Sequence, residues 1–310
     1  MLTVCNYHYI RNDFQKPYPS IFGVTPIEFE NQLNELGKTA TFITPNDLFF
    51  SMDEILGSKK SYLLVTFDDG LKEQFELALP ILKNKNIEAL FFINSMNYIE
   101  KKVSMVHKIH LVRSEISPLK IRQELAKRIE EENYRLTTVD IKKAIAHYLY
   151  DDKESACIKY LLNFKLPKDQ LNKLITVLFS KYFNEEQVIN SLYMTNDQLQ
   201  HLANNNLIGN HTHSHLALGL LPKMHIEEEI YKTFSFLQNF KKNTNLAISY
   251  PYGSVEACQF PVSEIAHKIG HAIGFSMERG NNDLTANKLM LKRFSSNDLP
   301  GGKNYIKDDN

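Results

Sequence analysis

The feature that most constrains the fold is a pair of largely apolar runs separated by one helical pattern. Tyr62–Phe67 and Ala89–Ile93 lack the alternation of a strand with one face in water. Continuous runs of this kind are typical of parallel strands that are covered on both faces. Between them, Phe75, Leu79 and Leu82 recur at helical spacing. The sequence therefore predicts a βαβ unit and, with it, a parallel sheet.

Other short apolar segments repeat this pattern along the chain. They predict strands near residues 2–7, 207–209, 246–249, 272–275 and 289–294, with helical patterns between most of them. Polar residues follow several of these strands. Alternating strands and helices with chemistry at the carboxyl ends of strands favour a (β/α) barrel.

Two helix starts carry a sequence signature. Residues 25–28 read TPIE and residues 195–198 read TNDQ. In each, the threonine can cap the helix while the residue three positions later reaches back to the cap. A proline, as at Pro26, suits the first helical turn. We expect helices to begin at both positions.

The segment from 97 to 190 has a different character from the rest. Charged residues are more frequent, no strand-like run occurs, and apolar residues such as Leu174 and Leu178 recur at helical spacing. We interpret this segment as a helical insertion. It divides the predicted barrel into residues 1–96 and 191–310.

Composition argues against several classes of partner. The 36 basic and 36 acidic residues balance, which disfavours nucleic acid and a polybasic membrane-binding surface. Residues 1–14 show no secretory signal, and no run reaches the roughly 18 apolar residues of a membrane span. Cys5, Cys157 and Cys258 lie far apart, as expected of free thiols. These features predict a soluble cytoplasmic protein and leave the oligomeric state open.

Two adjacent carboxylates, Asp68 and Asp69, follow the first apolar run and precede Gly70. Successive strand residues face opposite ways, so a turn that begins here can direct the two side chains to different tasks. One could hold a cation and the other could take a proton from water on that cation. A solvated turn is the simpler alternative.

A histidine cluster follows a later strand. Residues 211–215 read HTHSH, which places three of the 11 histidines in five positions. On a helical turn, His211 and His215 would lie on one side, and His213 would point elsewhere. A carboxylate with two imidazoles suits Zn²⁺ or a similar ion with one position open for water. A polar loop that happens to be histidine-rich is the competing interpretation.

A third motif is weaker. Residues 250–253 read YPYG and follow another apolar strand. A rigid loop of this kind can wall a pocket, and its backbone N–H groups can face a developing oxyanion. A tight turn without chemistry has the same pattern.

Taken together and in this order, the motifs TFDDG, HTHSH and SYPYG resemble the first three motifs of the polysaccharide deacetylase family, carbohydrate esterase family four. Residues 7–10 and the predicted strand 289–294 also resemble an atypical bacterial branch of that family. The resemblance covers residues 1–95 and 195–300.

The resemblance implies a metal-dependent N-deacetylase on a distorted (β/α)₇ barrel. By position, Asp69, His211 and His215 would bind one divalent metal, with Zn²⁺ expected first and Co²⁺ or Ni²⁺ as alternatives. Asp68 would be the general base that deprotonates the attacking water. The chemistry agrees, because bound Zn²⁺ can lower the pKa of water to about 7 and polarise a carbonyl.

The chain departs from the family pattern in three places. Ser249 occupies the position of the arginine that usually orients the base. Arg293 could reach in as a substitute, and a surface arginine is the alternative. The fourth motif needs a tryptophan, which this chain lacks, and the fifth needs a histidine, but none follows His271. His8 is the best spare imidazole for the general acid, and a structural histidine is the alternative.

These observations predict a hydrolase that removes an N-acetyl group from an amino sugar in a saccharide or sugar-linked precursor. Tyr252, Pro251 and Arg293 are expected to contact the carbohydrate. A deformylase of a formamido sugar would use the same motifs. The alternative from another class is a non-catalytic carbohydrate-binding protein on the same barrel.

Overall fold

The computed structural model describes residues 1–310 except 19, 22, 149–150, 241–245 and 306–310. The chain divides into two units. The first consists of residues 1–13, 23–102 and 189–310, and the second of residues 14–22 and 103–188.

The strands lie in the first unit. They are β1 Leu2–Tyr7, β2 Thr41–Phe42, β3 Tyr62–Phe67, β4 Ala89–Ile93, β5 Ile208–Asn210, β6 Leu246–Ser249, β7 His271–Phe275 and β8 Phe294–Ser295. Seven of them follow the order β7-β6-β5-β4-β3-β1-β8, and β2 pairs with β3. All of these pairings are parallel.

The two ends of this sheet approach each other through the segment before β8. Leu291 forms a parallel bridge with Phe275 of β7, and Phe294 pairs with Cys5 of β1. The sheet therefore curls into the distorted (β/α)₇ barrel that the sequence predicts.

The last strand differs from its prediction. The predicted strand 289–294 is only partly formed, because the chain pairs first with β7 and then with β1. Between the two ladders, the Arg293 N–H donates to the Glu278 carbonyl at 3.0 Å. This change of partner interrupts the strand at Arg293.

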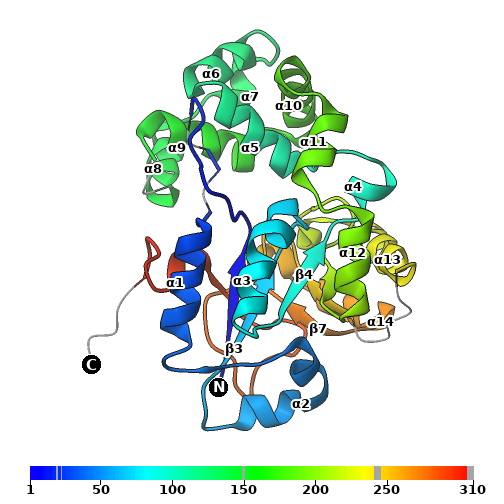
Figure 1. The fold of residues 1–310 in the computed structure, drawn as a ribbon. Coiled ribbons are helices and arrows are strands. Elements are labelled where there is room, and N and C mark those ends of the chain that lie inside the picture. The colour runs from blue at the N-terminus through cyan, green and yellow to red at the C-terminus, as the bar shows by residue number, and fades with distance from the viewer. Residues whose placement is uncertain (19, 22, 149–150, 241–245, 306–310) are drawn as a thin grey trace. The chain divides into compact units, whose positions relative to one another are not determined.

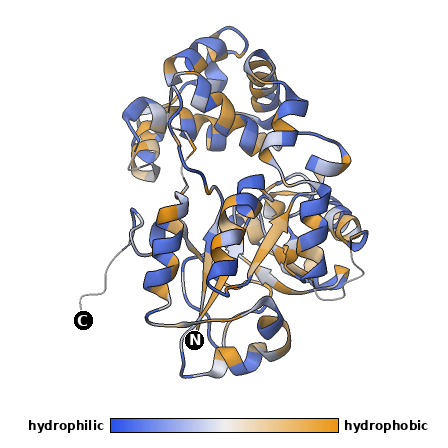
Figure 2. Ribbon diagram, in the orientation of Figure 1, coloured by the Kyte–Doolittle hydropathy of each residue, from blue (hydrophilic) through white to orange (hydrophobic). Residues whose placement is uncertain are grey.

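Helices surround the strands in the first unit (Figure 1). They are α1 Pro26–Leu36, α2 Pro45–Gly57, α3 Leu79–Asn84, α4 Met96–Ile99, α12 Asn196–Asn204, α13 Lys223–Gln238 and α14 Val262–Ile269, with short turns at Gln74–Ala78, Leu218–Leu220, Glu256–Cys258 and Ser296–Asp298. Figure 2 shows apolar strands and helices with one polar and one apolar side. That pattern is expected where each helix buries one face against a sheet.

Both predicted capping boxes are present. The Thr25 side chain accepts from the Glu28 N–H at the start of α1, and Thr195 and Gln198 form the equivalent pair at α12. Helix α2 begins with a third box, from Thr44 to Asp47. No helix was predicted there, although an aspartate can replace glutamate in the same signature.

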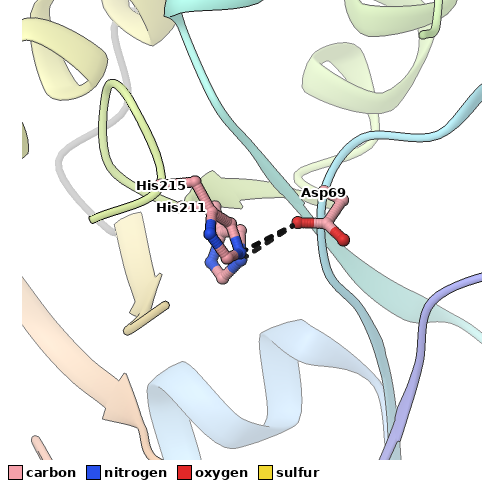
Figure 3. Close-up of side chains that lie close together, drawn as sticks. All are labelled: Asp69, His211 and His215. Carbon is pink, nitrogen blue, oxygen red and sulfur yellow. Dashed lines mark ion pairs between the residues drawn. The ribbon is translucent and has the colours of Figure 1, made fainter. Parts of the chain in front are cut away.

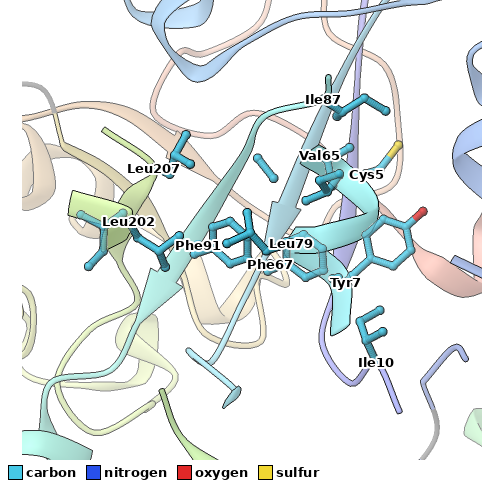
Figure 4. Packing of buried hydrophobic residues seen from close by; sticks show 14 of the residues in the cluster. Cys5, Tyr7, Ile10, Val65, Phe67, Leu79, Ile87, Phe91, Leu202 and Leu207 are labelled. Atoms are coloured by element: carbon cyan, nitrogen blue, oxygen red, sulfur yellow. The ribbon is translucent and has the colours of Figure 1, made fainter. Parts of the chain in front are cut away.

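The strand residues alternate between two apolar layers. Val65, Phe67 and Phe91 belong to the layer beneath the helices, together with Leu79 of α3 and Leu202 of α12 (Figure 4). The rings of Phe67 and Phe91 are stacked, with centroids 4.9 Å apart. Burying one such side chain contributes about 1.5–3 kcal/mol.

The other layer fills the barrel interior. Leu64, Leu90, Phe92 and Phe275 pack there with Leu48 and its neighbours from α2. Helix α2 therefore closes the barrel at the amino-terminal ends of the strands. The opposite end is left for polar residues.

The inward row of β3 becomes polar at its carboxyl end. Side chains alternate along a strand, so Thr66 and Asp68 continue the row of Leu64. The Asp68 N–H donates to the Tyr7 carbonyl at 3.1 Å, which extends the β1–β3 ladder to this residue. Asn6 of β1, which pairs with Thr66, is buried beside this row. Polar side chains therefore lie inside the barrel at the carboxyl ends of its strands.

Helices make up the second unit where its residues are described. They are α5 Met105–Glu115, α6 Pro118–Ala126, α7 Glu131–Tyr134, α8 Thr138–His147, α9 Lys153–Tyr160, a π-helical turn Leu161–Lys165, α10 Lys168–Tyr182 and α11 Glu185–Leu192, which continues into the first unit. Their apolar core includes Ile121, Leu125, Leu174 and Leu178.

No helix among the described residues combines the length and the apolar character that spanning a bilayer requires.

Candidate metal centre

Three side chains with potential ligand atoms converge at the carboxyl ends of β3 and β5. The Asp69 Oδ1 atom lies 3.4 Å from His211 Nε2 and 3.3 Å from His215 Nε2. Figure 3 shows both imidazoles close to this carboxylate. All three side chains are buried, and their ligand atoms lie within 4.8 Å of one another.

These separations fit a tetrahedral metal ion. Zn²⁺ bonds of about 2.0–2.2 Å at tetrahedral angles place neighbouring ligand atoms about 3.4 Å apart. His211 Nδ1 donates to the Ser249 carbonyl at 2.8 Å, so the neutral ring has its lone pair on Nε2, which faces Asp69. A nitrogen and an oxygen that both present lone pairs repel each other unless a cation or a proton lies between them. The donor set therefore fits a divalent metal.

The backbone around the two histidines is not a helical turn, although both imidazoles lie on one side, as such a turn would place them. Residues 211–215 form a loop in which Thr212 and His215 have φ of 64° and 57°. These left-handed residues direct both imidazoles to the same side. A local helical repeat is not needed, because the turn itself brings the rings together.

Left-handed backbone is concentrated at this site. Among the described residues, seven other than glycine have positive φ, and four of these are Asp69, Thr212, His215 and Tyr252. Such conformations cost about 1–3 kcal/mol each and persist only where surrounding contacts enforce them. Their clustering is typical of a functional site.

The adjacent carboxylate, Asp68, binds a guanidinium. Arg293 Nη1 donates to Asp68 Oδ1 at 3.0 Å and Nη2 donates to Oδ2 at 2.8 Å. Arg293 is fully buried, with 0% of its surface exposed. The alternative of a surface arginine is therefore wrong, and the two neighbouring aspartates have different partners.

Three further polar residues complete this network, and none was predicted. Asn6 Nδ2 donates to Asp68 Oδ2 at 2.9 Å, while Asn6 Oδ1 accepts from Arg293 Nη1 at 2.8 Å. Thr66 Oγ1 donates to Asn6 Oδ1 at 2.9 Å, and Ser249 Oγ accepts from Arg293 Nη2 at 2.8 Å. Asn6 and Thr66 are polar residues within apolar strands, which is the signal that marks them in the sequence.

The network sets the charge of the site. Burial disfavours ionised Asp68, but Arg293, His211 and His8 together outweigh it and hold the pKa of that carboxyl well below its usual range. Burial also disfavours charged His211, yet Asp68 and Asp69 raise its pKa above the ordinary value. Asp68 is thus ionised at neutral pH, and a proton competes with a metal ion for His211.

The remaining predicted residues lie around these groups. His8 Nε2 is 3.9 Å from Asp68 Oδ2, and the His8 side chain is 41% exposed. The Tyr252 ring meets the His215 ring edge-on, with centroids 5.1 Å apart. Pro251 is buried immediately before Tyr252. A half-exposed imidazole and a tyrosine therefore flank the buried carboxylates.

A parallel barrel with a buried Asp-His-His group that could hold a metal ion, beside a second buried aspartate, is an arrangement that suits a barrel hydrolase. The family model described as polysaccharide deacetylase matches residues 57–138 and 171–273, which is more than half of the chain. The chain belongs to the polysaccharide deacetylase family.

Solved deacetylase structures have the same fold. Deacetylase PplD of Streptococcus pyogenes, solved with acetate, is 15% identical, with a TM-score of 0.53 over 97% of this chain and 93% of that one. IcaB of Ammonifex degensii is 17% identical, with a TM-score of 0.54 over 95% and 91%. The BpsB deacetylase domain of Bordetella bronchiseptica is 16% identical, with a TM-score of 0.53 over 95% of each chain. No curated protein matches this chain.

Proposed function

We propose that this chain is a metal-dependent hydrolase that removes the N-acetyl group from an amino sugar in a saccharide or sugar-linked precursor. One observation carries the proposal: Asp69, His211 and His215 converge at the spacing of a tetrahedral metal site. Membership of the polysaccharide deacetylase family supports a carbohydrate substrate. Zn²⁺ as the metal and a cytoplasmic location remain predictions.

A divalent ion held by Asp69, His211 and His215 would acidify a water molecule and polarise the amide carbonyl. Asp68 would serve as the general base and would take a proton from the attacking water while the water oxygen attacks the carbonyl carbon. The low pKa of Asp68 keeps it ionised, but it also makes Asp68 a weak base. A base this weak would need an attacking water acidified by the ion that Asp69, His211 and His215 could hold.

The C–N bond breaks once the amine nitrogen receives a proton, and we assign this step to His8. Its imidazole is 3.9 Å from Asp68 Oδ2 and half-exposed, so it borders both the base and the solvent from which the sugar arrives. The products are acetate and a free amine. Backbone N–H groups of the loop that contains Tyr252 would face the developing oxyanion.

Arg293 takes a positioning role in this proposal in place of the substrate contact that was predicted. Its guanidinium is fully buried and donates to Asp68, Asn6 and Ser249. It keeps Asp68 charged and oriented. Tyr252 is exposed beside His215 and is the better candidate to touch the sugar, while Pro251 stiffens its loop.

The first experiment measures metal content and hydrolysis on the same preparation. We expect about one equivalent of divalent metal, with release of acetate and free amine from N-acetylated chito-oligosaccharides. Asp69→Ala should lose both the metal and ~10³-fold or more of the rate, because the metal supplies several kcal/mol. His225→Ala, an exposed residue on α13, is the matched control.

The same assay separates the alternatives. An N-formylated sugar that reacts in preference to the N-acetylated one would identify a deformylase. Full metal occupancy without turnover of either substrate would favour a carbohydrate-binding protein and exclude the hydrolase.

The role of His8 has its own test. His8→Gln should keep its metal and lose about 10²- to 10⁴-fold in rate on the amide. An acetyl ester with a phenolate leaving group needs no protonation, so its hydrolysis should fall far less. Equal losses on both substrates would remove His8 as general acid.

A further inference from the structure

The histidine between the two proposed ligands has partners of its own. The His213 side chain is buried, with Nε2 2.9 Å from Glu100 Oε1 and Nδ1 2.8 Å from Ser95 Oγ. Because a carboxylate only accepts, Nε2 carries the hydrogen, and in the neutral ring Nδ1 accepts from the Ser95 hydroxyl. Ser95 Oγ is also 2.7 Å from Thr233 Oγ1 on α13. One imidazole therefore ties the ligand loop to the segment after β4 and, through Ser95, to α13.

The backbone of the same loop is held by the same two elements. The His213 N–H donates to the Glu229 carbonyl at 2.9 Å, and the His213 carbonyl accepts from the Met96 N–H at 3.1 Å. The Ser214 N–H and hydroxyl both donate to the Glu229 carboxylate, at 2.8 and 2.5 Å. These contacts are buried or partly buried, so water competes with them only weakly.

The loop needs such contacts because its conformation is intrinsically unfavourable. Thr212 and His215 on either side of His213 both have left-handed backbone, which is costly for residues other than glycine and most costly for a β-branched one. Without external contacts, the loop would relax and separate the two imidazoles. Metal ligands must be held within about 0.5 Å of their productive positions to bind well.

We propose that His213 is a positioning residue for the metal centre. It does not bind the ion, but it holds the loop in the ligating shape, so that the site is formed before the metal arrives. This inference rests on the proposed function. His213 acts through the loop, so its loss should weaken metal affinity and distort the site while the acid–base groups remain intact.

The test measures metal binding on the full chain. Zn²⁺ affinity is obtained by competition with a chromophoric chelator, and the geometry of the site is read from the visible spectrum of the Co²⁺-loaded protein. His213→Leu should bind Zn²⁺ about 10- to 100-fold more weakly, the range found when outer supports of metal sites are removed, and should show altered Co²⁺ bands. His225→Gln, on the exposed side of α13, should match wild type in both measurements.

A second pair of variants guards against failure to fold. Glu100 is 36% exposed, so its replacement should be tolerated. Glu100→Gln retains an acceptor for His213 Nε2 and should bind Zn²⁺ nearly as tightly as wild type, whereas Glu100→Ala should bind about tenfold more weakly. If Glu100→Gln restores the Zn²⁺ affinity that Glu100→Ala loses, the hydrogen bond to His213 is what positions the loop, and the negative charge of Glu100 is not required.

The outcomes separate this inference from the proposed function. A folded His213→Leu variant with wild-type Zn²⁺ affinity and Co²⁺ spectrum would overturn the positioning role. If that variant does not fold, wild-type affinity in Glu100→Ala would overturn it. Failure of the wild-type chain itself to bind metal would instead remove the proposed function.

Discussion

The helical unit and the barrel site both bury carboxylates, but they give them different partners. In the helical unit, Glu124 is 3% exposed and lies against Lys127, Arg128 and Lys181. Each partner is a cationic side chain, so the charge of the carboxylate is balanced without a metal ion. Such a cluster stabilises helices and has no ligand position.

At the strand ends, one of the two neighbouring aspartates has a cationic partner of this kind and the other does not. Asp68 binds the cationic Arg293, as a structural ion pair would, whereas Asp69 faces the Nε2 atoms of two imidazoles, and in neutral His211 that atom offers a lone pair. Buried charge by itself is therefore a poor marker of function. The convergence of lone-pair donors distinguishes the site, and the following predictions test that distinction.

The largest effect is expected from Asp68→Asn, which removes the proposed base. Metal should be retained, and kcat should fall about 10³- to 10⁴-fold, at the upper end of the contribution of general base catalysis. Metal content and kcat are measured on the same folded sample. Retained turnover would show that Asp68 is only half of an ion pair.

The next effect concerns the stability of that pair. Arg293→Met leaves Asp68 buried without its cation and should lower the free energy of unfolding by about 3–5 kcal/mol. In the double variant with Asp68→Asn, much of this loss should be recovered, while turnover should stay absent. Urea unfolding of the single and double variants gives the coupling energy; additive losses would contradict a direct interaction.

A smaller, pH-dependent effect is expected from His271, which supports the ligand loop through Asn210. His271 Nδ1 donates to the Leu246 carbonyl at 3.0 Å, so Nε2 accepts from Asn210 Nδ2 at 3.0 Å, and Asn210 Oδ1 accepts from the Thr212 N–H at 2.8 Å. Burial lowers the pKa of His271 to about 4. An imidazole whose pKa is lowered on folding stabilises the protein above its unfolded pKa near 6.5, and this contribution is lost as the pH falls toward 4.

The loss should reach about 3 kcal/mol at most, since one pKa unit corresponds to about 1.4 kcal/mol. It is measured as the difference in unfolding free energy between wild type and His271→Gln from pH 7.5 to pH 4.5, both with chelator. A difference that does not change with pH would contradict a buried neutral imidazole.

The smallest effect is expected in the helical unit. Glu131 of α7 and Arg135, which follows its last residue, form an exposed ion pair at 3.2 Å, with the Arg135 and Glu131 side chains 74% and 64% exposed. Solvent screens such a pair, so Arg135→Ala should change the free energy of unfolding by about 0.5 kcal/mol or less. Thermal unfolding checks this value. A loss as large as that of Arg293→Met would remove the contrast between the two regions.

Much of the fold could be predicted because its signals are local. Continuous apolar runs identify β3 and β4, and a threonine followed three residues later by glutamate or glutamine identifies the starts of α1 and α12. These patterns depend on neighbours within one or two turns of chain. Pairing with distant segments does not alter them.

The site could be predicted only in part. The motifs identify Asp68, Asp69, His211 and His215 as the chemical groups, but the spacing of the histidines does not reveal the left-handed backbone of their loop. Asn6 shows no motif at all. Its role depends on a guanidinium that arrives from 287 positions further along the chain.

By itself, then, the order of residues determined the class of fold and the chemical types available at the strand ends, because periodicity and capping are properties of short segments. Only the tertiary structure decided which atoms meet: that Arg293 enters the barrel to reach Asp68, and that a loop with left-handed backbone turns both imidazoles toward Asp69. Such contacts join segments that are remote along the chain, and the packing that enforces them exists only once the barrel has closed.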